Sequence, residues 1–223
     1  PGYRHLAANA NPLARYRRHL GEGIDESITN PARLDHRLAS QICGACHSVS
    51  SIKQEEDFLS WHRNGPGFRP GEDLEETRHL VRARDLDPPM TKTLIASNPH
   101  YLEDSFWSDG MVRVSGREYT ALLDSPCHKR GDISCLSCHQ MHNPSSDDQA
   151  IETWRDDQLK PGMRGNLACT GCHEHEKLAD ENQLRQHTQH LPSSAGSNCY
   201  NCHMPFTSYG LLKGTRSHEV DSP

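Results

Sequence analysis

Four copies of one short motif constrain this chain more than any other feature. Each copy reads Cys-x-x-Cys-His, and together they use eight of the nine cysteines in 223 residues. A random order of these residues would seldom produce even one copy. The copies are Cys43-Gly-Ala-Cys46-His47, Cys135-Leu-Ser-Cys138-His139, Cys169-Thr-Gly-Cys172-His173 and Cys199-Tyr-Asn-Cys202-His203.

The motif is the attachment signature of c-type haem. Its two thiols add to the two vinyl groups of a porphyrin, and the following histidine reaches the iron as the proximal ligand. Zinc is the alternative, but zinc ribbons separate their cysteine pairs by about 15–20 residues, whereas the gaps here are 88, 30 and 26 residues. Zinc also gives no reason for a histidine after every pair. We therefore expect four covalent haems c on these eight cysteines, with His47, His139, His173 and His203 as proximal ligands.

The composition is too polar for an ordinary core. Leu, Ile, Val and Phe make up only about 17% of the residues, below the roughly 20% at which disorder is expected, and the mean hydropathy is −0.83. Four porphyrins could supply the missing apolar core. We expect one domain over residues 1–223 that is mainly α, with extensive loops and one short β-hairpin. Within it, residues 1–125 form a looser half with the first haem, and residues 126–223 form a compact cluster with the other three.

Local signals place several helices and the hairpin. Asn-Pro pairs at 11–12 and 30–31 are typical of helix starts, the second leading directly into Cys43. Apolar periodicity predicts further helices over 54–63, 73–84 and 176–190. Asp109-Gly110 predicts the turn of a hairpin over 105–114.

Distal ligands must come from the remaining histidines, because 12 are left against 5 Met. His142, three residues after His139, cannot reach the same iron and would serve a neighbouring haem. One of His187 and His190 is expected to be a ligand, more readily His190 because it is nearer the fourth motif.

His218 follows the last motif in a turn-like tail and is the next candidate. His5 is the fourth choice, with His36 as its alternative, and a ligand donated by another copy of the chain stays open. Cys127 is the unpaired cysteine, interpreted as a buried free thiol or an interchain disulfide.

The net charge and the expected cellular location limit the kinds of partner that this protein can have. The formal net charge is −6, and haem propionates would add to it, so nucleic acid is not an expected partner. No run of apolar residues is long enough to cross a membrane. Covalent haem attachment takes place outside the cytoplasm, so we expect a periplasmic or extracellular protein. The chain begins at Pro1 without a visible signal peptide, which we interpret as a trimmed N-terminus.

The sequence also resembles a known superfamily over residues 40–220. The residues that carry the resemblance are Cys127 to His142, the pair His187 and His190, the segment Cys199 to Pro205, and the tail Tyr209 to His218. In these it is similar to the multihaem c-type cytochromes, which include hydroxylamine oxidoreductase, pentahaem nitrite reductase and tetrahaem electron carriers.

The resemblance implies bis-histidine haems in close contact and supports His142, His190 and His218 as distal ligands. Pro1-Gly2-x-x-His5 resembles the end of a family segment with a further haem motif, which supports His5 and leaves open whether another motif precedes Pro1. Some tetrahaem members are similar to subunits of extracellular cytochrome filaments.

Two classes of function follow. The first is electron transfer through four six-coordinate haems, in contact with other redox proteins or as a homo-oligomer or filament with head-to-tail haem contacts. The second is a redox enzyme acting on a small nitrogen or sulfur compound at one five-coordinate haem. The family's nitrite reductases use Cys-x-x-Cys-Lys at the catalytic haem, and this motif does not occur here. We therefore favour the carrier, with no catalytic residue.

Overall fold

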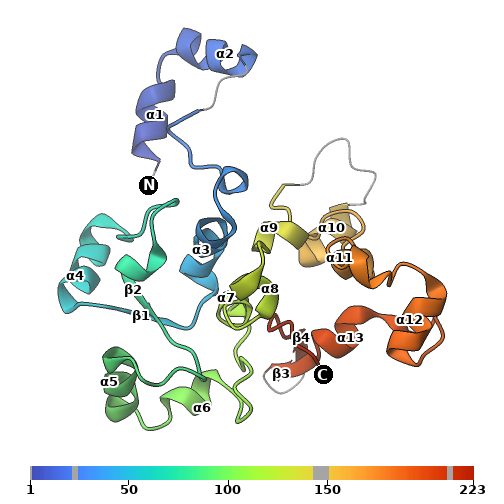
Figure 1. Cartoon of the computed structure of the whole chain (residues 1–223). Coiled ribbons are helices and arrows are strands. Elements are labelled where there is room, and N and C mark those ends of the chain that lie inside the picture. The colour runs from blue at the N-terminus through green and yellow to red at the C-terminus, as the bar shows by residue number, and fades with distance from the viewer. Residues whose placement is uncertain (1, 22–24, 143–150, 210–212) are drawn as a thin grey trace.

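The computed structural model describes residues 2–21, 25–142, 151–209 and 213–223 (Figure 1). In this part the chain is mainly helical, as predicted. The α-helices are α1 (Tyr3–Asn9), α2 (Pro12–Leu20), α3 (His36–His47), α4 (Glu55–Asn64), α5 (Pro89–Ser97), α6 (Tyr101–Ser105), α7 (Glu118–Leu122), α8 (Pro126–Arg130), α9 (Cys135–Cys138), α10 (Ile151–Asp157), α11 (Leu167–Thr170), α12 (Glu181–Thr188) and α13 (Cys199–His203). Short 3-10 turns η1 (Pro31–Arg33), η2 (Leu74–Glu76), η3 (Glu174–Glu176) and η4 (Ala195–Ser197) lie between them.

Side-chain caps explain where the helices begin. The carboxamide of Asn11 accepts hydrogen bonds from the backbone of Leu13 and Ala14 at the start of α2, as its Asn-Pro pair predicts. The second Asn-Pro pair starts only the single turn η1. The helix that carries Cys43 begins afresh, where the Asp35 carboxylate accepts from the backbone amides of Arg37 and Leu38. The helix predicted over 54–63 is confirmed as α4.

Two sheets of two strands replace some of the expected helix and loop. Strands β1 (Ser50–Ile52) and β2 (Arg78–Leu80) pair antiparallel, so the helix predicted over 73–84 is wrong beyond the single turn η2. Strands β3 (Phe206–Tyr209) and β4 (Lys213–Arg216) form a hairpin in the tail that we expected to be turn-like. The predicted hairpin at 105–114 is reduced to one bridge between Phe106 and Val112, with Gly110 in the left-handed region at its turn.

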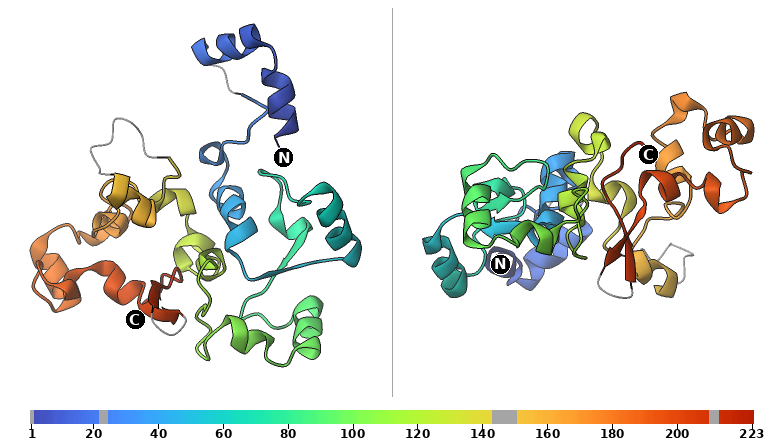
Figure 2. Two further views of the ribbon diagram at one scale, coloured as in Figure 1. Left: turned by 180° about the vertical axis from the view of Figure 1, so that it is seen from behind. Right: turned by 90° about the horizontal axis from the view of Figure 1, so that it is seen from below.

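The side-chain core is small and divided. One cluster centres on Phe68, Leu74, Tyr119 and Leu122, and another on Val49, Val81 and Phe106. The accessible surface is 15063 Å², against about 10,300 Å² for a compact protein of this mass. Figures 1 and 2 show the same looseness: α3 to α8 form one group, α10 to α13 another, and α1 and α2 project from the first.

Candidate haem-attachment site

The four motifs lie on short helices that associate in two pairs. The first and second motifs lie on α3 and α9, which pack against each other. The Cys43 and Cys135 thiols are hydrogen-bonded, and this contact lowers the pKa of Cys43 to about 7. Ser40 of α3 fixes the pair, because its hydroxyl accepts a hydrogen bond from the backbone N–H of Cys135 at 3.4 Å.

The third and fourth motifs repeat this arrangement on α11 and α13. The thiols of Cys169 and Cys199 are hydrogen-bonded, and burial raises the pKa of Cys169 to about 12. Asn166 joins the two helices: its amide donates to the carbonyl of Ser197 at 2.8 Å and its oxygen accepts from the backbone of Cys199 at 3.0 Å. The first motif, expected in a looser half of its own, is thus attached directly to the second.

Three of the motif histidines are oriented through their Nδ1 atoms. His139 Nδ1 donates to the carbonyl of Asp157 at 2.9 Å, and His203 Nδ1 donates to the carbonyl of Asp221 at 2.7 Å. His47 Nδ1 instead donates to the carboxylate of Glu118 at 2.8 Å. Metal-binding histidines usually donate their second N–H to such an acceptor. Each ring therefore keeps Nε2 available for an iron.

Two of these histidines lie beside a second imidazole whose ring plane is nearly parallel to theirs, and the ring separation is close to that of two imidazoles on one iron. The His139 and His218 rings have centroids 6.2 Å apart and planes 21° apart, and the His203 and His187 rings have values of 6.0 Å and 13°. Two imidazoles on opposite sides of one metal, with metal–nitrogen bonds of about 2.0–2.1 Å, have centroids about 6.3 Å apart. His218 Nδ1 also lies 3.2 Å from a backbone carbonyl, that of Arg216, and burial lowers the pKa of His218, which favours its neutral, ligating form.

His218 is thus the histidine outside the motifs that lies beside His139, and His187, rather than His190, lies beside His203. The choice of distal ligand stays a prediction. Helix α12 ends at Thr188, and Gln189 adopts a left-handed conformation with φ 59°. This turn separates His190 from the helix face of His187. His190 packs instead on Gly196, where a Cβ atom would lie only 2.5 Å from its ring.

Two further predicted ligands, His142 and His173, lie at the surface. His142 lies exposed in a bend three residues after His139. His173, the histidine of the third motif, is exposed at the start of η3. Which histidines would bind the irons of the first and third motifs, on the side opposite to His47 and His173, stays a prediction.

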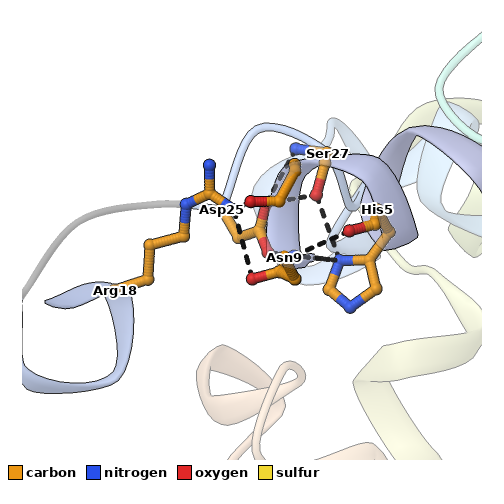
Figure 3. A network of polar contacts seen from close by, with 6 residues as sticks. His5, Asn9, Arg18, Asp25 and Ser27 are labelled. Atoms are coloured by element: carbon orange, nitrogen blue, oxygen red, sulfur yellow. Dashed lines mark hydrogen bonds and ion pairs between the residues drawn. The ribbon is translucent and has the colours of Figure 1, made fainter. Parts of the chain in front are cut away.

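His5 lies on α1, away from α9, α11 and α13 (Figure 1). Its Nδ1 is 3.1 Å from the Ser27 hydroxyl and 3.3 Å from the Asp25 carboxylate, and the second ring nitrogen faces away from both (Figure 3). The Ser27 side chain, followed by the Ser27 backbone, Asn9 and Arg18, lowers the pKa of Asp25 to about 2. The ring of His5 is thus oriented like that of a ligand, without a described iron site beside it.

His128 is a further candidate ligand that was not predicted from the sequence. Its ring is buried in α8, its Nδ1 lies 3.0 Å from the carbonyl of Ile133, and burial lowers its pKa. The ring of His36 contacts it edge-on with centroids 5.2 Å apart, too close for one iron to lie between them. The signal available in the sequence was its position seven residues before Cys135. Its neighbour Cys127 is a half-buried thiol with no disulfide within the chain.

The residues present fit haem in three respects. They offer two cysteines and one histidine at each motif, they fix three of the four proximal rings through Nδ1, and the chain exposes far more surface than a self-sufficient core would. In the described part of the chain, no three His, Cys, Asp or Glu side chains gather as a metal site of their own. A haem iron needs only two protein ligands, because the porphyrin supplies four.

Comparison with known proteins gives no relative: no family model, curated protein or solved structure matches the chain. None of the described helices has the length and apolar character to cross a membrane.

Proposed function

We propose that this protein is a tetrahaem c-type cytochrome that transfers electrons. The observation that carries the proposal is the pairing of His139 with His218 and of His203 with His187. Both pairs join a motif histidine to a histidine outside the motifs, at the separation expected for two axial ligands of one iron. Saturated irons of this kind favour electron transfer over substrate binding.

The chain's own groups would attach, orient and connect the cofactors. The eight motif thiols would form the thioether bonds to the haem vinyl groups, and the carbonyls of Asp157 and Asp221 would hold the rings of His139 and His203 in place. A bound haem supplies a one-electron iron couple, whose potential depends on its axial ligands and their hydrogen bonds. The contacts of Cys43 with Cys135 and of Cys169 with Cys199 bring the attachment points together in pairs, which shortens the paths between cofactors.

The proposal includes the location and the partners. Thioether attachment implies a periplasmic or extracellular protein, and its partners would be other redox proteins or further copies of the chain. Helices α1 and α2 offer a surface for such contacts, because they project from the body and expose Tyr3, Leu6, Leu13, Tyr16 and Leu20.

Expression in a host with a c-type cytochrome maturation system tests the proposal. Intact mass spectrometry should show four haems, and paramagnetic resonance should show low-spin ferric iron at the second and fourth motifs. The reduced protein should not bind carbon monoxide. Fewer than four covalent haems would refute the tetrahaem assignment. A high-spin signal with carbon monoxide binding would favour the enzyme acting at an open iron.

A further inference from the structure

We propose that Glu118 lowers the potential of the haem on the first motif below the potentials of the haems on the second and fourth. The inference rests on the proposed function and concerns the order of the cofactors in the relay. It makes Glu118 a positioning and tuning residue that acts through His47.

The three proximal histidines with described Nδ1 acceptors are not equivalent. His139 and His203 donate to neutral backbone carbonyls, whereas His47 donates to a carboxylate at 2.8 Å. Hydrogen bonds to an ionised acceptor are roughly twice as strong as neutral ones. A carboxylate therefore draws the Nδ1 proton further from the ring and makes Nε2 a stronger donor to the iron.

Stronger donation and a nearby negative charge both stabilise ferric iron relative to ferrous iron. The haem on the first motif should then be the hardest of these three to reduce. The ring of His218 lies in the same region, but its Nδ1 is 3.2 Å from the carbonyl of Arg216. The direct effect of the carboxylate thus falls on His47.

The surrounding structure keeps Glu118 in place. The second carboxylate oxygen accepts from the backbone of Gly116 at 2.9 Å. The next residue in α7, Tyr119, packs so closely on Gly44 of the first motif that a Cβ atom there would lie 2.3 Å from the ring. Thr120 then accepts a buried hydrogen bond from the backbone of Val49 at 2.7 Å. Helix α7 is thereby fixed to both ends of the segment that carries His47.

The Glu118 carboxylate is partly shielded from solvent. Its side chain is 28% exposed, against 54% for the side chain of His47. A glutamate carboxyl has a reference pKa of about 4.3, so it ordinarily carries its charge at neutral pH.

Spectroelectrochemical titration of the tetrahaem protein and its Glu118→Gln variant tests the inference. The substitution keeps an oxygen acceptor for the ring and removes the charge. One of the four one-electron transitions, among the lowest in the wild-type protein, should rise by about 59 mV or more, which corresponds to a tenfold change in equilibrium constant. The other three should move much less.

Glu103→Gln is the matched control. Glu103 accepts from His100 Nδ1 at 2.9 Å, the same type of contact on a histidine outside the motifs, with 74% of each side chain exposed. This variant should leave all four transitions unchanged. If Glu118→Gln fails to take up haem, Glu118→Asp, which retracts the charge, should raise the same transition by less.

The outcomes separate this inference from the proposed function. Four low-spin haems whose transitions do not move in Glu118→Gln, or all rise equally, would overturn the role of Glu118 alone. Missing haems in the wild-type protein would instead overturn the tetrahaem proposal.

Discussion

The area that the chain leaves exposed predicts that it cannot fold without its cofactors. Its surface of 15063 Å² exceeds by about 4,800 Å² the value for a compact protein of 25.1 kDa. Replacing the eight motif cysteines by serine removes attachment, and nothing then covers this area. The two small apolar clusters around Tyr119 and Val81 are too limited to hold 223 residues together.

Small-angle scattering measures the effect directly. A compact chain of this length has a radius of gyration of about 17 Å, and an unfolded one about 51 Å. The tetrahaem protein should lie near the first value and the eight-serine variant far toward the second. Cys127→Ser, which leaves every motif intact, should remain compact. A compact eight-serine variant with dispersed amide signals would refute the reasoning, because side chains alone would then form the core.

Three further predictions concern single residues. His187→Ala should convert one haem to a high-spin, carbon monoxide-binding form, whereas His190→Ala should leave it low-spin; the reverse would assign the distal position to His190 instead of His187. Gly44→Ala should destabilise the haem protein by about 1–3 kcal/mol in urea unfolding, through overpacking against α7, while Gly165→Ala, where a Cβ atom meets nothing within 4 Å, should be nearly neutral. Burial opposes but does not cancel the hydrogen bonds that lower the pKa of Asp73. Asp73 therefore stabilises the fold at pH values above its pKa in the unfolded chain, about 3.9. This stabilisation is lost as the pH falls through the lower pKa of Asp73 in the folded protein. Asp73→Asn should lower the free energy of unfolding by about 1–3 kcal/mol at pH 7. It should also make the free energy of unfolding depend less on pH in the acid range.

Local rules predicted the parts of the fold that depend on local interactions. Asn11 with Pro12 predicted the start of α2. The helix expected over 73–84 was wrong because β2 pairs with β1, more than twenty residues earlier. That long-range pairing overrides the helical pattern of charges and leaves only the turn η2.

The positions of His187 and His190 show that local patterns also fail to predict where a helix in the site ends. Both residues share a face only if the helix continues through position 190. The left-handed conformation of Gln189 ends it two residues earlier, and no glycine marks this break in the sequence. His128 was not predicted either. It lies in no motif, and its burial depends on how α8 packs in the folded chain.

A short segment of the C-terminal tail contacts both the second and the fourth motif. His218 faces His139 of the second motif, and the carbonyl of Asp221 accepts from His203 of the fourth. Three residues of extended chain span at most about 11 Å, so the covalent backbone itself limits the separation of these two sites. In the proposed cytochrome, the distance an electron travels between them would be set by bond lengths rather than by the looser packing of two helical groups.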